Sequence, residues 1–133
     1  MMSVFHTGFY VSALILLNII LSVRIILLRR RHKVGIGTGK NLELSLAIRA
    51  HANLVEHAPL ALILIACVEL SLDEKLWVNI LGLTLIVARF LHAWGISHRA
   101  GTSIGRFAGT FLTFSVGLTG AVIIALQGLG LLR

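Results

Sequence analysis

The chain has 133 residues, of which 57% are hydrophobic and 13% are charged, and its mean hydropathy is +0.96. Soluble domains contain about 45–50% apolar residues even when glycine is counted, so this composition excludes an ordinary soluble domain and indicates one small integral membrane domain. The net charge of +7 does not indicate a nucleic-acid-binding protein, because the basic residues cluster where apolar runs end. The single cysteine excludes an intramolecular disulfide.

Four apolar runs are each long enough to cross a bilayer as a helix, which predicts an all-α integral membrane four-helix bundle. The runs cover about residues 5–28, 44–72, 76–97 and 104–129. Basic residues follow the first run instead of preceding it, so we expect this run to stay attached as a span and not to be a secretory signal. The glycine-rich segment 34–40 lacks the ending of a nucleotide-binding loop and is predicted to be a flexible connector.

The charges of the connecting segments predict an orientation in the membrane. The second connection carries one basic residue beside three acids, whereas the first and third together carry six basic residues: Arg29, Arg30, Arg31, Lys33, Lys40 and Arg99. Because basic loops stay in the cytoplasm, the first and third loops are expected there, and both termini are expected in the periplasm or lumen.

The second run begins with a polar stripe. At about 100° per residue, Arg49, Asn53 and Glu56 fall within roughly 60° of one another on a helix, while His51 points to nearly the opposite side. Polar and charged side chains are costly inside a bilayer, so this stripe is a candidate functional site.

Arginines in the other spans lie at a similar depth. Arg24, Arg89 and Arg106 each fall toward the cytoplasmic end of their spans, although Arg24 could also snorkel to the interface. Arg49 and Glu56 are seven residues apart, about 10 Å along the axis, which predicts that Glu56 pairs with Arg89 across two helices and not with Arg49. The positive charge that is left over favours an anionic ligand.

The fourth run contains small residues at every fourth position, which predicts a close-packing seam with another span or another subunit. The positions are Gly105, Gly109, Thr113, Gly117, Ala121 and Ala125. Because four short helices enclose little space for a ligand, a homo-oligomer with sites between subunits is the expected assembly.

Several of these residues together resemble the MAPEG family, the membrane-associated proteins in eicosanoid and glutathione metabolism, and in particular its small bacterial branch. The second-span pattern is Arg49-x-His51-x-Asn53-x-x-Glu56 followed by Pro59, the third-span pattern is Ala88-Arg89-x-x-His92, and Arg24 stands ahead of a basic cluster. The resemblance extends over nearly the whole chain.

The resemblance implies a homotrimer in the bacterial inner membrane that binds glutathione as co-substrate in clefts between subunits, open to the cytoplasm. It implies that the glutathione-binding residues are Arg24, Arg49, Asn53, Glu56, Arg89 and His92. It also implies that a catalytic arginine stabilises the thiolate, for which Arg106 is favoured over Arg99. The implied activity is transfer of glutathione to hydrophobic electrophiles, or peroxidase activity, in the membrane.

Other readings follow from the same residues. An eicosanoid synthase is not expected, because Ile96 and Thr110 fall where such relatives carry tyrosines. No metal site is expected, because the sequence has no paired-cysteine or His-Glu-x-x-His pattern. A non-catalytic protein of this fold remains an alternative, as does a small four-span transporter, although a cation exporter would need an acid in the first span, where Arg24 stands.

Overall fold

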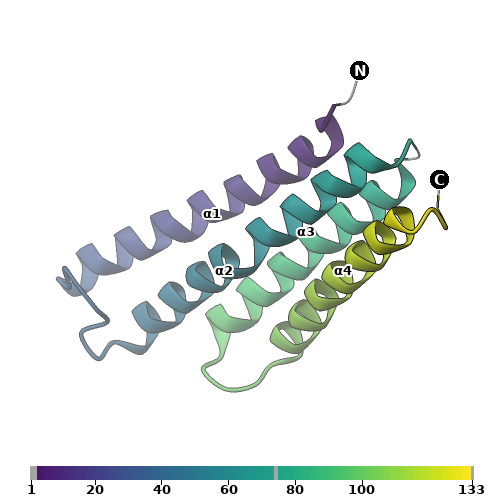
Figure 1. Ribbon diagram of the computed structural model, residues 1–133. Helices are drawn as coiled ribbons and strands as arrows, with labels where there is room; N and C mark the ends of the chain where they lie inside the picture. The colour runs from purple at the N-terminus through teal and green to yellow at the C-terminus, as the bar shows by residue number, and fades with distance from the viewer. Residues whose placement is uncertain (1–2, 74, 133) are drawn as a thin grey trace.

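The computed structural model describes residues 3–73 and 75–132. The described chain forms four α-helices (Figure 1): α1 (Phe5–His32), α2 (Leu42–Ser71), α3 (Leu76–His98) and α4 (Ile104–Gly128). Each helix begins and ends within four residues of the apolar run that predicts it. All four helices are long and apolar enough to cross a membrane, so the protein is all-helical and consistent with a membrane four-helix bundle.

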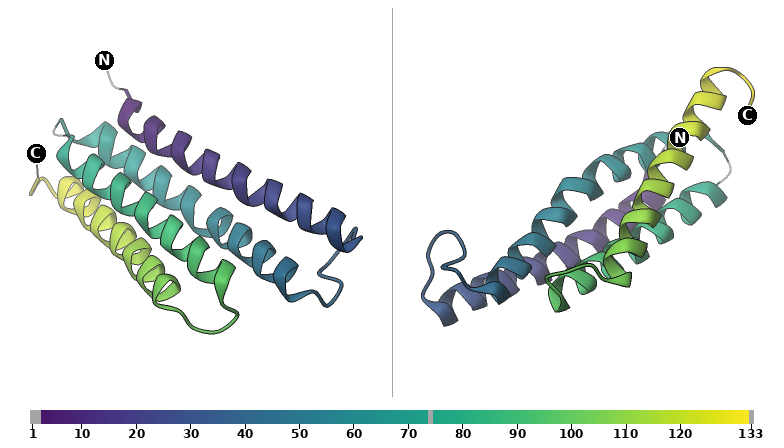
Figure 2. Two further views of the ribbon diagram at one scale, coloured as in Figure 1. Left: turned by 180° about the vertical axis from the view of Figure 1, so that it is seen from behind. Right: turned by 90° about the horizontal axis from the view of Figure 1, so that it is seen from below.

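The helices run alternately up and down, with α2 and α3 in the middle of the bundle (Figures 1 and 2). α1 packs on α2 and α3, and α4 packs on α3 and α2, but within residues 3–73 and 75–132 α1 and α4 do not contact each other. The loops of residues 33–41 and 99–103 lie together at one end, which we call the basic end. The start of α1, the end of α2, the start of α3 and the end of α4 lie at the other end.

Most of the buried side chains are aliphatic and recur with helical spacing. Leu14, Leu17 and Leu21 share one face of α1 and pack into a buried cluster with Leu54 of α2 and Leu85 of α3. Large apolar side chains are also exposed around the outside of every helix. A helix that is apolar on all sides is expected in a lipid environment, where the outer face contacts acyl chains.

The small residues of α4 form the predicted seam only over its first half. Gly105 and Gly109 are buried against α3, and a Cβ added at Gly109 would lie 2.6 Å from the carbonyl oxygen of Ala88. Thr113 is also buried, at 6% exposure. Without side chains at these two glycines, the backbones of α3 and α4 approach each other closely.

Within one subunit the predicted seam does not continue along the second half of α4, and the alternative of a partner subunit there stays a prediction. Ala121 and Ala125 are exposed, and a Cβ added at Gly117 would meet no atom within 4 Å. The buried positions shift to Val116 and Gly120. Positions four apart are separated by about 400°, so a strict spacing of four drifts by about 40° at each step and leaves the buried face of a straight helix.

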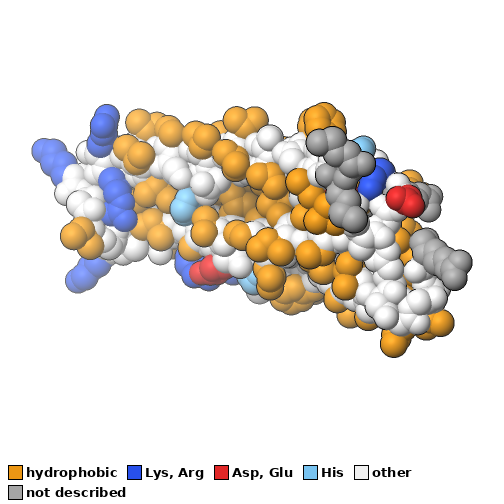
Figure 3. All heavy atoms as spheres, turned by 45° about the horizontal axis from the view of Figure 1, so that its top comes forward, with side chains coloured by type: hydrophobic (Ala, Val, Ile, Leu, Met, Phe, Trp, Pro, Cys, Tyr) orange, Lys and Arg blue, Asp and Glu red, His pale blue; other side chains and the backbone are white. Residues whose placement is uncertain are grey.

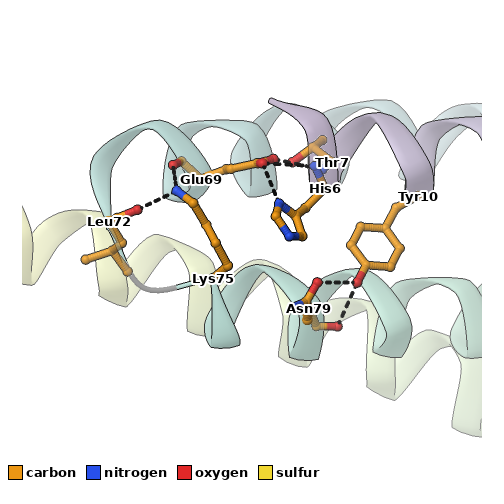
Figure 4. Close-up of polar contacts among 7 residues, drawn as sticks. All are labelled: His6, Thr7, Tyr10, Glu69, Leu72, Lys75 and Asn79. Carbon is orange, nitrogen blue, oxygen red and sulfur yellow. Dashed lines mark hydrogen bonds and ion pairs between the residues drawn. The ribbon is translucent and has the colours of Figure 1, made fainter. Parts of the chain in front are cut away.

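At the end of the bundle opposite the basic end, a buried carboxylate connects α2 to α1 (Figure 4). Glu69 of α2 is 2% exposed and accepts hydrogen bonds from the backbone N–H groups of His6 at 2.9 Å and Thr7 at 2.7 Å. The N-cap residue of α1, Val4, has no capping side chain, so Glu69 supplies the acceptor for the first turn of α1 from a neighbouring helix. The sequence analysis counts Glu69 among the three acids of the second connection. Its capping contact with α1 is visible only in the tertiary structure.

Candidate functional site

The polar stripe of α2 divides into an outward pair and an inward residue. Arg49 Nη1 lies 3.6 Å from Glu56 Oε1, and the two side chains are 61% and 51% exposed. Asn53, between them, is half-buried and turned toward α3. The predicted Glu56–Arg89 pair is therefore wrong. Residues seven apart return to the same face after two turns, and these two long side chains bend toward each other along the axis to cover the distance.

Arg89 is buried within the subunit at 2% exposure. Its Nη1 donates to Asn53 Oδ1 at 2.9 Å, and its Nη2 donates to the Gly109 carbonyl oxygen at 3.1 Å and to the Thr113 hydroxyl. The Thr113 hydroxyl itself donates to the Gly109 carbonyl at 2.8 Å. Arg89 thus links α2, α3 and α4 through neutral oxygen atoms. With so little exposed surface, its guanidinium is enclosed within the subunit.

A cavity of about 320 Å³ lies at the basic end, beside the start of α4. It is lined by His92 from α3 and by Thr102, Ser103, Arg106, Phe107 and Thr110 from the α3–α4 loop and α4. His92 is only 6% exposed, one turn along α3 from Arg89. Close packing shapes this region, because a Cβ added at Gly95 would lie 2.7 Å from the backbone nitrogen of Arg106.

The side chain of Arg106 also holds the α3–α4 loop. Its Nη1 donates to the carbonyl oxygens of Gly101 at 2.7 Å and Ala100 at 3.3 Å, while the Ser103 hydroxyl caps α4 by accepting from the Arg106 backbone N–H. Among the described residues, Nε and Nη2 of Arg106 donate to no acceptor. The half-buried guanidinium therefore keeps donors available at the cavity.

The other two predicted arginines lie apart from this cavity. Arg24 is half-buried on α1, and it makes no hydrogen bond or ion pair with the part of the chain that the structure describes. Because α1 does not contact α4 within that part, one subunit does not bring Arg24 to Arg106. Arg99 is exposed and lines a neighbouring pocket of the α3–α4 loop with Phe107.

One subunit thus brings together some predicted site residues and separates others. Asn53 contacts Arg89, Arg49 contacts Glu56, and His92 shares a cavity with Arg106. Sequence reasoning did not assign Thr113 to the Arg89 network. The available signal was its position four residues after Gly109 on the face of α4 that carries the small residues, where a hydroxyl would be turned toward α3.

The sequence of this chain matches a protein-family model and bacterial relatives. A family model described as the MAPEG family matches residues 7–126, a range that includes every candidate site residue. The inner membrane protein YecN of Escherichia coli strain K12, and its counterpart in strain O6:H1 CFT073, are each 38% identical to this chain over 88 residues, which cover 66% of this chain and 66% of the relative.

The matched segment therefore spans slightly less than two thirds of the length of these relatives. Four apolar helices and relatives from an inner membrane together support an integral, multi-pass membrane protein. Because the family model extends over nearly the whole chain and includes parts of all four helices, the chain belongs to the MAPEG family.

Proposed function

We propose that this protein is a glutathione S-transferase or peroxidase of the membrane, which binds glutathione between the subunits of a homotrimer and acts on hydrophobic electrophiles. The observation that carries the proposal is the cavity of about 320 Å³ in which Arg106, with unused donors, lies beside the buried His92. Its volume falls within the range of about 300–1,000 Å³ that is common for small-molecule sites.

The charges of the candidate residues suit glutathione, which carries two carboxylates, one ammonium group and a thiol. Arg24 and Arg49 provide guanidinium groups for the carboxylates, and Glu56 provides a carboxylate for the ammonium group. Asn53 adds an amide whose Oδ1 is already held by Arg89, which leaves its Nδ2 to donate to a ligand. The positive-inside distribution supports a site that opens to the cytoplasm.

The exposure of Arg49 and Glu56 supports an assembly of several subunits. Arg49 and Glu56 are more than half exposed although they lie in a membrane-spanning helix, and charged side chains in a lipid-facing position would be costly. A second subunit that covers this face would remove them from lipid. If α1 of the second subunit covers this face, Arg24 of that subunit becomes part of the site. Within the described part of one subunit, α1 does not contact α4, so Arg24 does not reach Arg106 of its own chain.

In the proposed reaction, bound glutathione supplies the nucleophilic thiolate. Arg106 would donate hydrogen bonds to the sulfur and so favour the thiolate over the thiol, with the thiol proton passing to solvent. With an aryl chloride as electrophile, the sulfur–carbon bond forms and chloride leaves. His92 and Phe107 would border the space beside the sulfur, where an apolar substrate can enter from the membrane.

The purified protein in mild detergent tests this proposal. We expect calorimetry to detect glutathione binding, ultraviolet absorbance to detect the thiolate, and conjugation of a chlorinated dinitrobenzene to show turnover. Arg106→Ala should remove the thiolate absorbance and turnover while leaving glutathione affinity largely intact, and Arg31→Ala, at an exposed position outside the cavity, is the matched control. Failure to bind glutathione at millimolar concentration contradicts the proposal.

One observation favours a second function, a non-catalytic membrane protein of the same family. The hydrogen bonds from Arg106 to the carbonyls of Ala100 and Gly101 give this arginine a structural role in holding the loop, which requires no substrate. Glutathione binding without thiolate absorbance or turnover would favour this function.

If Arg99→Ala and not Arg106→Ala removes the thiolate, the transferase proposal holds with Arg99 in the catalytic role.

A further inference from the structure

The basic end of α1 carries more positive charge than the described chain neutralises. Figure 3 shows Lys and Arg side chains gathered at one end of the molecule, beyond a broad hydrophobic band. Arg30, Arg31, Lys33 and Lys40 are all exposed, and none of them forms an ion pair with a described residue. The nearby carboxylate of Glu43 lies 3.7 Å from His32. A cluster of four uncompensated cations at the end of a span attracts anions of the membrane surface.

The loop after this cluster makes several contacts with the ends of α1 and α2. Arg29 Nη1 donates to the carbonyl oxygens of Gly35 and Gly37, each at 3.1 Å, and the side chain of Asn41 caps α2 while lying 3.2 Å from the ring of His32. Gly37, with φ +70°, adopts a left-handed conformation that glycine reaches without strain. These contacts connect the loop to the last turn of α1 and to the start of α2.

An exposed apolar face leads along α1 to these cations. Ile15, Ile19, Ile26 and Arg30 fall within about 60° of one another on the helix, roughly opposite Arg24, and the three isoleucines are 52%, 51% and 49% exposed. This face is therefore separate from the side of α1 that would meet a neighbouring subunit through Arg24. Its apolar side chains lie in the hydrocarbon and its basic end lies at the membrane surface.

An apolar groove lies at the far end of the same face. It has a volume of about 230 Å³ between α1 and α2, and its lining includes Ile15, Asn18, Leu54, Ala58 and Pro59. Arg30 lies twelve residues after Asn18, a rise of about 18 Å, and one leaflet of hydrocarbon is about 15 Å thick. An acyl chain whose headgroup contacts Arg30 would therefore end in this groove, near the middle of the bilayer.

We propose that the basic end of α1 and the α1–α2 groove form a binding site for one anionic phospholipid. Arg30 and Lys33 hold its phosphate-bearing headgroup, Arg31 adds positive charge from the neighbouring side of α1, and Ile26, Ile19 and the groove hold one acyl chain. A free phosphate offers the same charge but gains nothing from the apolar face. This site is distinct from the proposed glutathione site, so either proposal can fail without the other.

The test compares lipids retained by the whole protein, using native mass spectrometry after purification in mixed micelles. The micelles contain equal amounts of phosphatidylglycerol and phosphatidylcholine. We expect the protein to retain the anionic lipid preferentially, and the triple variant Arg30→Gln, Arg31→Gln, Lys33→Gln to lower this retention by at least about tenfold. Arg99→Gln, at another exposed arginine of the basic end, should retain it normally. Equal retention of the anionic lipid by the triple variant and the wild type would overturn the proposal.

Further measurements test headgroup binding, acyl-chain binding and the intactness of the fold separately. Ile15→Phe, which fills the groove, should lower retention severalfold, whereas Leu118→Phe, at a position of α4 that is 70% exposed, should not. Unchanged retention by Ile15→Phe would overturn the assignment of the acyl chain. Displacement of the lipid by millimolar inorganic phosphate would show a site for a free anion and would also overturn the proposal. An unaltered unfolding temperature of the triple variant in zwitterionic detergent shows that its fold is intact.

Discussion

Arg89 Nη1 donates to Asn53 Oδ1 at 2.9 Å, so a buried arginine of α3 holds the central residue of the polar stripe of α2. The partner of the buried charge is a neutral amide and not the carboxylate of Glu56. Arginine can be stabilised in this way because its Nη1 and Nη2 groups donate to an amide, a backbone carbonyl and a hydroxyl. Arg89 therefore acts as a positioning residue, since it determines which way Asn53 faces.

The first prediction concerns the coupling between Asn53 and Arg89. Asn53→Ala and Arg89→Met should each lower the unfolding temperature, and the double variant should lose less than the sum of the two, with a coupling of about 1–2 kcal/mol. Thermal unfolding of the four proteins in the same detergent measures this coupling. A parallel cycle between Asn53 and the exposed Arg31 should be additive, and additivity in the Asn53–Arg89 cycle would contradict the assignment.

The second prediction concerns the contact between α3 and α4. In Gly109→Ala the new methyl group would lie 2.6 Å from the Ala88 carbonyl and 2.7 Å from His92 Cβ, and both belong to the facing helix. We expect a loss of about 1–3 kcal/mol from this overpacking, together with weaker Arg89 contacts. Denaturant or thermal unfolding in detergent measures the loss.

Gly117→Ala is the matched control on the same helix. A Cβ at this position meets no atom within 4 Å, so this substitution should be neutral or should stabilise the protein by about 0.5–1 kcal/mol through helix propensity. Equal effects of the two substitutions would mean that close packing at Gly109 is not what joins the helices.

The third prediction concerns the attachment of α1. Glu69→Gln replaces a carboxylate that accepts two backbone hydrogen bonds with an amide whose NH₂ group would face a donor. We expect the variant to lose about 1–3 kcal/mol of stability and to exchange the amide hydrogens at His6 and Thr7 faster than the wild type. Hydrogen exchange followed by mass spectrometry of N-terminal peptides measures the second effect.

Glu43→Gln serves as the control for this substitution. The carboxylate of Glu43 is 49% exposed and lies 3.7 Å from His32, a geometry that contributes little to stability. If Glu69→Gln leaves exchange at the start of α1 as slow as Glu43→Gln does, the capping of α1 by Glu69 does not hold the helix in place.

The fourth prediction tests whether the proposed site is shared between subunits. Arg24→Ala and Arg106→Ala should each abolish conjugation when all subunits carry the same substitution. Random mixing of the two variants should restore activity at roughly a quarter of the sites, because a site built from Arg24 of one subunit and Arg106 of the next is then intact in one of four combinations. Coexpression of the two variants followed by a conjugation assay provides the measurement. Mixed assemblies without activity would contradict a shared site.

The sequence by itself determined the class of the protein, the four helices and the polar stripe. Hydropathy over about 20 residues reports whether a segment is stable in a bilayer, and the positions of Arg49, Asn53 and Glu56 on one helix follow from the angle between successive residues. These properties depend on local chemistry, so no knowledge of the neighbouring helices is needed. The same local spacing also predicts the first half of the α4 seam.

Only the tertiary structure decided which side chains are partners. The sequence places Glu56 and Arg89 at a similar depth in the membrane, which predicted that they pair. The rotation of each helix about its axis instead turns Glu56 outward to Arg49 and Arg89 inward to Thr113. Glu69 likewise becomes a cap for α1 because the helices that carry it and Thr7 lie side by side. These choices depend on how the helices pack against one another, a property of the whole bundle that no single segment contains.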